Sequence, residues 1–329
     1  MRAASLPLPW RVYRTRLTTR FRGLDHRDGV LLEGPAGWAE VSPFWDYDIA
    51  ESSAWLAAAL EAAYLGYPTP ERHAIPVNVT VPATTPDGAR TIIARRGGCE
   101  TAKVKVAEKG QSLADDLDRV AAVRDSFDGK IRIDANGGWD DESAIRAIPL
   151  LDKAARGLEY VEQPVASVEG LAKVRTAVNV PIAADESIRR ADDPYRVAEL
   201  NAADLIVCKV QPLGGVRACL QLASEIGMPV VVSSALESSV GIAAGVALAA
   251  SLPTLDHACG LATVQLFEQD VTSDSLVPAD GHLPVRAVNP DAIPMADEDL
   301  ESRWGERLAA MWDHVRATRD VGELTGGAL

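Results

Sequence analysis

Charged side chains recur at the ends of short apolar runs, and this recurrence is the most informative feature of the 329-residue chain. The residues concerned are Lys105, Asp134, Glu162, Asp185 and Lys209. Successive members are about 25 residues apart, roughly the length of one strand, one helix and their connections. Lysine and acidic side chains are seldom fully buried unless they are paired or bind a metal. Because the carboxyl ends of parallel barrel strands share one face, we expect these five side chains to meet there.

The three acids of this set predict a metal site. Asp134, Glu162 and Asp185 have no arginine at the same register, and carboxylates held together repel one another unless a cation joins them. Ligation by oxygen alone favours Mg²⁺, with Mn²⁺ as a substitute, over zinc. An individual acid could instead cap the helix that follows. Capping is reasonable for Asp134 or Asp185 alone, but it does not explain five charges at one register.

The lysines predict a proton acceptor. Lys103 and Lys105 alternate with valine, so they share one face of a strand. Neighbouring ammonium groups lower each other's pKa and partial burial adds to the effect, which makes a lysine usable as a base near neutral pH. Alone, this pattern is more typical of a solvated edge strand; the other strand ends favour the catalytic interpretation. Lys209 would then flank the metal from the side opposite Lys105.

Alternating strands and helices would position these residues. From about residue 75, short β-branched runs alternate with alanine-rich helical stretches. We expect strands at 77–81, 102–106, 131–134, 158–162, 182–185, 205–209, 230–233 and 258–262. We expect helices at 113–126, 142–155, 170–178, 194–200, 216–226 and 241–250. Eight apolar strands with helices between them predict a closed parallel barrel.

The two ends of the chain predict a second unit. A strand at 11–17, a polar loop at 18–23, a hairpin at 29–41 and a helix at 50–64 indicate an α+β arrangement. Trp304 and Trp312 lie on an amphipathic helix that is expected to fold back onto it. The predicted fold class is therefore α/β: a (β/α)7β-type TIM barrel with an α+β capping domain. The predicted boundaries are residues 76–284 for the barrel, and 1–75 completed by 285–329 for the capping domain.

Composition narrows the class of partner. The chain has 33 basic and 47 acidic residues, a net charge of −14 that argues against nucleic acid. The most apolar segment, 240–252, is too short to cross a bilayer, and no apolar signal stretch follows the first residues. The four cysteines form no CxxC pair, which argues against zinc and against a disulfide framework. We expect a cytoplasmic protein with a small-molecule partner and no membrane contact; the sequence does not indicate the oligomeric state.

Five motifs at the strand ends carry a resemblance to a known family: Lys103-x-Lys105, Asp134-x-Asn136, Glu162-Gln163-Pro164, Asp185-Glu186-Ser187 and Lys209-x-Gln211. They resemble the enolase superfamily, in the branch that includes muconate lactonising enzyme. That superfamily pairs a lysine or histidine base with Mg²⁺ that stabilises an enolate. The resemblance implies that Lys105 and Lys209 are catalytic and that Asp134, Glu162 and Asp185 bind Mg²⁺.

Within that branch, the chain resembles the o-succinylbenzoate synthase family. Arg132 and the segments 37–43, 233–239 and 258–263 carry this closer resemblance. It implies dehydration of a small carboxylate, 2-succinyl-6-hydroxy-2,4-cyclohexadiene-1-carboxylate, to 2-succinylbenzoate in menaquinone biosynthesis. The alternatives are an N-succinylamino acid racemase, a dipeptide epimerase and a barrel without catalysis. A dipeptide epimerase would be expected to carry an acidic pair on the last strand, and residues 257–260 offer none.

Other residues are expected to contact the substrate or to orient the ligands from behind: Lys103, Arg132, Asn136, Ser233, Ser234, Gly260 and Arg20. Lys103 would tune Lys105, and Asn136 would orient the metal ligands. The two serines and Gly260 would hold the succinyl tail. Arg20 or Arg22, in the loop at 18–23, would meet a substrate carboxylate; an ordinary solvated turn is the alternative. Glu186 is expected to bind a lysine or arginine.

Overall fold

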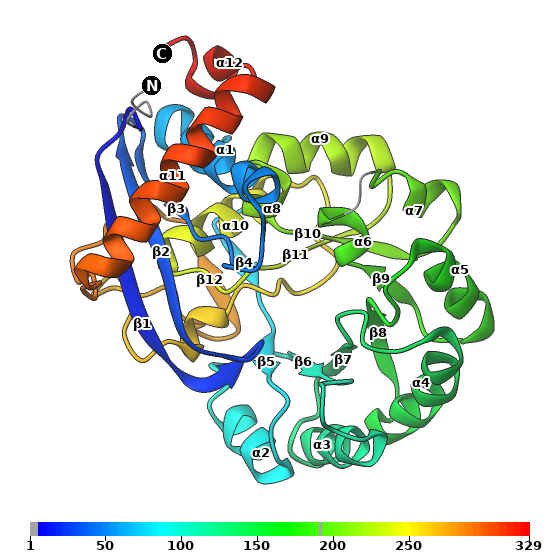
Figure 1. Cartoon of the computed structure of the whole chain (residues 1–329). Helices are drawn as coiled ribbons and strands as arrows, with labels where there is room; N and C mark the ends of the chain where they lie inside the picture. Colours follow the sequence, from blue (N-terminus) through cyan, green and yellow to red (C-terminus); the bar gives the residue numbers. More distant parts are fainter. Residues whose placement is uncertain (1–5, 191–192) are drawn as a thin grey trace.

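A parallel sheet forms the centre of the computed structural model, which describes residues 6–190 and 193–329 (Figure 1). Its seven strands lie in the order β11-β10-β9-β8-β7-β6-β5, so neighbours in the chain are neighbours in the sheet. The strands are β5 (Val79–Val81), β6 (Thr101–Lys105), β7 (Lys130–Asp134), β8 (Leu158–Glu162), β9 (Ile182–Ala184), β10 (Leu205–Cys208) and β11 (Val230–Val232). Every pairing among them is parallel, which confirms the α/β fold class.

Two residues of the expected eighth strand join the edges of this sheet. Cys259 forms a parallel bridge with Val77, and Gly260 forms one with Ser233. The segment expected as a strand at 258–262 therefore contributes isolated bridges in place of a regular strand. A Cβ at Gly260 would stand only 2.4 Å from Ser233 Oγ. A larger residue would therefore push these two segments apart where the barrel closes.

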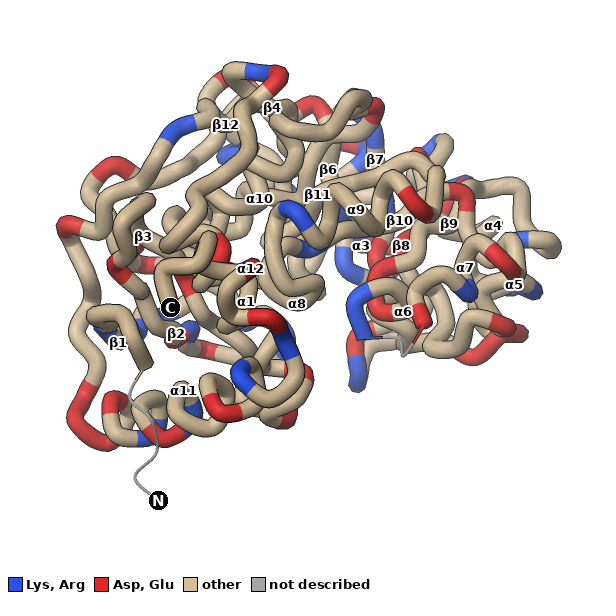
Figure 2. Tube along the Cα trace, turned by 90° about the horizontal axis from the view of Figure 1, so that it is seen from above, with Lys and Arg blue, Asp and Glu red and all other residues tan. Residues whose placement is uncertain are grey.

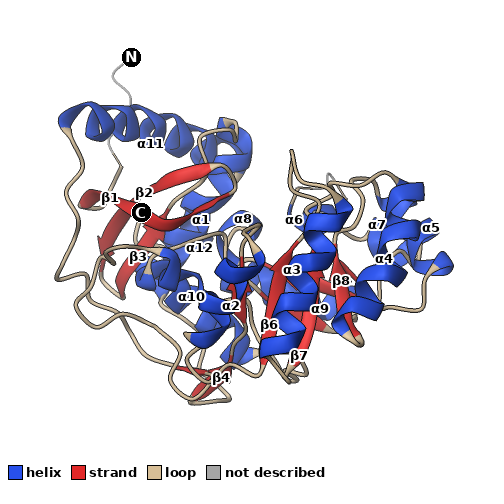
Figure 3. Ribbon diagram, turned by 90° about the horizontal axis from the view of Figure 1, so that it is seen from below, coloured by secondary structure: helices blue, strands red, loops and turns tan. Residues whose placement is uncertain are grey.

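Helices cover the outer face of the sheet (Figures 1 and 3). They and the short helices at the strand ends are α2 (Pro86–Ala94), α3 (Leu113–Ser126), α4 (Asp141–Ala155), α5 (Val168–Ala177), α6 (Glu186–Arg189), α7 (Arg196–Glu199), α8 (Val210–Leu213), α9 (Val216–Ile226) and α10 (Ser239–Ser251). The side chains of Asp140 and Ser167 cap α4 and α5. These helices therefore begin several residues after the strands end, which leaves the strand-end side chains free for other contacts.

An antiparallel sheet packs beside the barrel (Figure 3). It consists of β1 (Trp10–Phe21), β2 (Leu24–Gly34) and β3 (Gly37–Val41), and it packs with α1 (Ile49–Leu65). Two C-terminal helices, α11 (Glu298–Thr318) and α12 (Val321–Thr325), lie against α1. The remaining elements are β4 (Ala74–Pro76) paired with β12 (His282–Pro284), and η1 (Thr263–Leu266).

The segment expected as a polar loop at 18–23 is mostly strand, and that prediction was wrong. β1 continues to Phe21 and β2 begins at Leu24, so only Arg22 and Gly23 make the turn. Both residues have positive φ, 51° and 74°. Positive φ at both positions is typical of the tight two-residue hairpin turn that matches strand twist. We refer to residues 20–23 as the hairpin tip.

Charge and cysteine placement follow the composition. Acidic positions are spread over both parts of the molecule rather than gathered on one face (Figure 2). Across the described ranges, the structure contains no helix of the length and apolarity that crossing a membrane would need. All four cysteines are buried and unpaired, and burial raises the pKa of the Cys99 thiol to about 11.

Candidate active site

The three acids expected to bind a metal lie side by side on successive strands. Asp134 on β7 is in register with Glu162 on β8, and Glu162 is in register with Ala183 on β9, two residues before Asp185. All three carboxylates are buried, at most 1% exposed. Asp185 makes no side-chain cap bond to α6, and other residues cap α4 and α5. The capping alternative therefore does not account for this carboxylate row.

Lysine ammonium groups neutralise the row. Lys103 Nζ lies 3.2 Å from an oxygen of Asp134 and 3.2 Å from an oxygen of Glu162. Lys105 Nζ lies 2.5 Å from Asp134 Oδ2, and Lys209 Nζ lies 2.6 Å from Asp185 Oδ2. Lys105 and Lys209 thus approach opposite ends of the row, with Lys103 between them.

One arginine also contacts the row, and the expectation that these acids lack arginine partners was wrong. Arg189 Nε donates to Asp185 Oδ1 at 2.9 Å. The two residues are four positions apart, where helical neighbours face each other. The Asp-Glu-Ser motif continues directly into α6, so this spacing was the signal that sequence reasoning missed.

The row is not a ready-made metal cage. Among residues 6–190 and 193–329, no three histidine, cysteine or acidic side chains converge closely enough to hold an ion as they stand. The Lys103 ammonium, which bridges Asp134 and Glu162, takes the position between them. The donor set nevertheless fits a divalent cation, because it offers buried carboxylate oxygens from three adjacent strands. Burial and the charge of Asp134 raise the pKa of Glu162 to about 7. A bound cation would lower this pKa again, because positive charge favours the ionised carboxylate.

The two lysines of β6 differ in environment. Burial lowers the pKa of Lys105, and the charge of Lys103 adds to this while Asp134 opposes it. Burial would also lower the pKa of Lys103, but the carboxylates of Glu162 and Asp134 outweigh it and raise that pKa. The expectation of a lowered pKa is therefore wrong for Lys103. Lys105 is the one whose pKa moves toward neutral pH.

Asn136 links Lys105 to the acid after Asp185. Its Oδ1 accepts from Lys105 Nζ at 2.7 Å, and its Nδ2 donates to Glu186 Oε1 at 3.2 Å. The backbone of Asn136 adopts φ 46°, a left-handed conformation that is uncommon outside glycine. Glu186 also accepts from Arg189, as expected for a residue that binds a basic partner.

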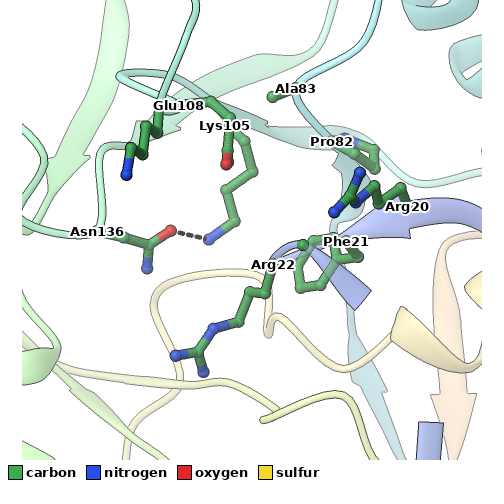
Figure 4. Close-up of a pocket in the computed structure, with 10 residues that line it drawn as sticks. Arg20, Phe21, Arg22, Pro82, Ala83, Lys105, Glu108 and Asn136 are labelled. Atoms are coloured by element: carbon green, nitrogen blue, oxygen red, sulfur yellow. Dashed lines mark hydrogen bonds between the residues drawn. The ribbon is translucent and has the colours of Figure 1, made fainter. Parts of the chain in front are cut away.

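Two cavities meet at Lys105. The inner cavity, of about 30 Å³, has walls that include Lys103, Lys105, Asn136, Lys209, Ser233, Ser234 and Gly260, together with Phe21, Arg22, Phe44 and Arg189. The outer cavity, of about 400 Å³, is lined by Lys105, Asn136 and the hairpin tip, Arg20 included. In Figure 4, Lys105 points toward Asn136 while the hairpin tip lies across the cavity. The structure thus gathers around Lys105 most of the auxiliary residues, that is, those expected to contact the substrate or to orient the ligands.

Arg132 is the auxiliary residue that lines neither cavity. Its guanidinium donates to Glu159 at 2.9 Å, to the Tyr160 hydroxyl at 2.8 Å and to the Ala258 carbonyl at 2.9 Å. Glu159 also contacts His257 at 3.0 Å. Arg132 itself is fully buried, two residues before Asp134 on β7, so its direct contacts are structural.

The antiparallel sheet β1–β3 and the loop after β3 supply residues that were not predicted from the sequence. Phe44 lines the inner cavity, and the guanidinium groups of Arg22 and Arg27 stack on its ring at 4.3 Å and 4.4 Å. Arg27 Nε also donates to the Leu236 carbonyl at 2.9 Å, across to the loop after β11. No charge pattern along the chain marks Phe44, because its role depends on contacts distant in sequence.

Comparisons with known proteins identify the family of this chain. The family "Enolase C-terminal domain-like" matches residues 87–291, and "Enolase N-terminal domain-like" matches residues 12–63. The o-succinylbenzoate synthase of Thermobifida fusca (strain YX) is 56% identical over 311 residues, 93% of this chain and 97% of the relative. That of Mycobacterium tuberculosis (strain ATCC 25618 / H37Rv) is 52% identical over 300 residues, 90% of this chain and 91% of the relative.

A solved structure supports the fold independently. The L-Ala-D/L-Glu epimerase from Bacillus subtilis superposes with a TM-score of 0.74 at 24% identity, over 89% of this chain and 99% of that one. At this identity the likeness concerns the fold alone. Together, the family matches and the identity to curated relatives confirm the resemblance inferred from the strand-end motifs. The chain belongs to the enolase superfamily and, within it, to the o-succinylbenzoate synthase family.

Proposed function

We propose that this protein is an o-succinylbenzoate synthase of menaquinone biosynthesis. It would dehydrate 2-succinyl-6-hydroxy-2,4-cyclohexadiene-1-carboxylate to 2-succinylbenzoate. Enzymes of its superfamily use a divalent metal ion. Identity of 56% to the Thermobifida fusca synthase across nearly all of both chains supports the proposal. The structural observation that carries it is a buried carboxylate row with Lys105 at one end and Lys209 at the other.

Asp134, Glu162 and Asp185 would hold the metal, which we propose is Mg²⁺ with Mn²⁺ as a substitute. When bound, it supplies positive charge that offsets the negative charge developing on the substrate carboxylate as the neighbouring proton leaves. The Lys103 ammonium between Asp134 and Glu162 supports this assignment, because it indicates that the space between them accepts a cation.

Lys105 is the proposed base. As a neutral amine, it would take the proton from the carbon next to the carboxylate. The C–H bond breaks and the electron pair enters the ring. Lys105 would then give the proton to the departing hydroxyl, which leaves as water when the C–O bond breaks. The lowered pKa of Lys105 favours the neutral amine. Lys209 would stabilise charge from the other side or contact the ring face as a cation.

The cavity walls would bind the rest of the substrate. Ser233, Ser234 and Gly260 are proposed to hold the succinyl tail, and Arg20 or Arg22 to meet a carboxylate. With about 30 Å³ free, the inner cavity has room for about one water molecule. We therefore propose that the hairpin tip moves away to admit the substrate and closes over it afterwards.

An assay of the purified protein with Mg²⁺ tests the proposal. We expect conversion of the cyclohexadiene to 2-succinylbenzoate, and loss of that activity after chelation with EDTA. A panel of N-succinylamino acids and dipeptides, assayed beside it, measures specificity. Absence of product from the cyclohexadiene under these conditions would refute the synthase assignment.

A second candidate is an N-succinylamino acid racemase. The observation that favours it is the placement of Lys105 and Lys209 at opposite ends of the row. A racemase needs one acid–base group on each side of the reacting carbon, because it removes the proton from one face and returns it to the other. A racemase would exchange the α-proton of both enantiomers with solvent deuterium. A dehydratase without racemase activity would leave both enantiomers unlabelled.

Two further predictions remain proposals. We propose that residues 1–75 and 285–329 form the capping domain and that residues 76–284 form the barrel. We also propose a cytoplasmic location, since reduced thiols are typical there and the four cysteines are unpaired. Limited proteolysis and cell fractionation would test these proposals.

A further inference from the structure

The guanidinium of Arg189 contacts three separate parts of the site. Nε donates to Asp185 at 2.9 Å, one terminal nitrogen donates to Glu186 at 2.5 Å, and the other donates to the Tyr47 hydroxyl at 2.7 Å. The side chain is only 3% exposed. All three nitrogens of this guanidinium are therefore engaged in directed hydrogen bonds, and its position is closely defined.

Two of these contacts lead to the reacting groups. Asp185 is a proposed metal ligand. Glu186 Oε1 also accepts from Asn136, which in turn accepts from the Lys105 ammonium. A continuous hydrogen-bonded chain thus runs from Arg189 through Glu186 and Asn136 to the proposed base.

The third contact leads to the capping side of the molecule. Tyr47 precedes α1 and packs edge-on against Phe44 and Trp55, with ring centroids 5.8 Å and 6.1 Å apart. Arg307 of the C-terminal helix α11 donates to the Tyr47 carbonyl at 3.0 Å. Tyr47 is therefore held firmly, and its hydroxyl gives Arg189 a fixed reference outside the barrel.

We propose that Arg189 is a positioning residue: it fixes Asp185 directly and Lys105 through Glu186 and Asn136, and it anchors both to Tyr47. This inference rests on the proposed function. A planar guanidinium donates in fixed directions to several acceptors at once, whereas a lysine ammonium is a compact charge on a flexible stem. Precise placement matters because an error of about 1 Å in a reacting group can reduce the rate about 100-fold.

A counter-ion would act differently from a positioning residue. If Arg189 only neutralised Asp185, any change that keeps its charge would leave the site unaffected. Tyr47→Phe makes such a change, since it removes one hydroxyl and no charge. Arg189→Lys also keeps the charge but loses the directed fork. Arg190→Met is the matched control: Arg190 is the next residue and also faces the capping side, where it pairs with Glu51 at 2.9 Å and stacks on the Tyr47 ring at 4.7 Å.

Two measurements on the full-length protein test the proposal: Mg²⁺ affinity by titration calorimetry after EDTA treatment and dialysis, and kcat and KM for the cyclohexadiene. We expect Tyr47→Phe to weaken Mg²⁺ binding about threefold, since one neutral hydrogen bond is lost, and Arg189→Lys about tenfold, as for other residues that orient metal ligands. We expect kcat to fall about tenfold and about 100-fold respectively, with KM within about twofold. Arg190→Met should match the wild type in both measurements.

Wild-type Mg²⁺ affinity and kcat in both Tyr47→Phe and Arg189→Lys would overturn the proposal and leave Arg189 a counter-ion. Equal losses in Tyr47→Phe and Arg190→Met would also overturn it. They would indicate a general loosening of the contact between the capping domain and the barrel, and no specific role of the Tyr47–Arg189 hydrogen bond. Circular dichroism checks folding, and Tyr47→Phe alone suffices if Arg189→Lys does not fold. Mg²⁺ binding needs no substrate. If no variant converts the cyclohexadiene but the affinity shifts appear, the proposed function fails while the positioning of Asp185 stands.

Discussion

At the residue scale, Lys103 and Lys105 show how position decides chemistry. They share one strand face, yet Lys103 lies between two carboxylates while Lys105 reaches both cavities. We expect Lys105→Ala to lower kcat about 10³-fold, as the loss of a positioned base typically does. Steady-state kinetics measure this, with the exposed Lys153→Ala as the control. Undiminished turnover in Lys105→Ala would show that no chemistry runs through this residue.

The same scale shows what the sequence could predict of the site. Lys105, Asp134, Glu162, Asp185 and Lys209 were predictable together because a regular βα repeat places the ends of successive strands at one face. The register of β6 to β10 in the structure brings them there. Their roles stay predictions.

Contacts that depend on partners far along the chain were not predictable. Arg189 reaches Tyr47, which is 142 positions away in the sequence. Arg132 turns to Glu159, Tyr160 and Ala258 rather than to the cavities. Alternation along a strand indicates which face of the sheet a residue occupies. It does not indicate where along the barrel axis the end of a long side chain lies.

At the element scale, the hairpin tip gives a prediction about binding. Arg22 lines both cavities and stacks on Phe44 at 4.3 Å. We expect Arg22→Ala to raise KM for the cyclohexadiene about tenfold, because a charge-assisted contact to a carboxylate is lost. The fold should be unaffected, since the residue is exposed at a turn. Arg16→Ala, on the preceding strand β1, is the control, and an unchanged KM in Arg22→Ala would place the substrate carboxylate elsewhere.

The loop after β11 gives a prediction about pH. Glu237 is buried there, and burial together with the charge of Glu40 raises its pKa from 4.5 to about 7 while Arg27 opposes this. Between these two pH values the folded protein holds a proton that the unfolded chain has released. The free energy of unfolding therefore falls as pH rises through this window, by on the order of 3 kcal/mol from this group.

Glu237→Gln should remove that contribution, since glutamine resembles the protonated acid. We expect the variant to gain stability relative to the wild type between pH 5 and pH 8, by roughly 2 kcal/mol. Urea unfolding at the two pH values measures it, with the exposed Glu301→Gln as the control. An equal difference between variant and wild type at both pH values would mean that Glu237 does not titrate in this range.

Local chemistry at their ends made several regular elements predictable, although α2 was missed despite the Thr85 cap and Pro86 at its start. The helix expected at 113–126 is α3, whose capping box is formed by Ser112 and Asp115. The helix expected at 216–226 is α9, which ends at Gly227 in the left-handed conformation. The short helices α6 and α8 were missed, because four residues are too few to show a period. The eighth strand was overestimated because tertiary closure reduces it to bridges at Cys259 and Gly260.

At the scale of the whole molecule, distant parts of the chain meet over the barrel mouth. Arg307 of α11 donates to the carbonyls of Phe44 and Tyr47. Phe44 faces the inner cavity, and Tyr47 bonds to Arg189. Contacts from the C-terminal helix thus pass through one loop to the carboxylate row. Occupation of the row should consequently be visible in the stability of the whole protein.

Mg²⁺ should therefore raise the melting temperature. A ligand at 100 times its Kd stabilises the folded state by about 2.7 kcal/mol, which corresponds to roughly 5–10 °C for a large domain. Differential scanning calorimetry of EDTA-treated protein, with and without Mg²⁺ at matched ionic strength, measures the shift. In Glu162→Gln one ligand charge is lost, so most of the shift should disappear, whereas the exposed Glu142→Gln should keep it. A full shift in Glu162→Gln would mean that Mg²⁺ binds away from the carboxylate row, because removal of a buried ligand cannot leave the affinity unchanged.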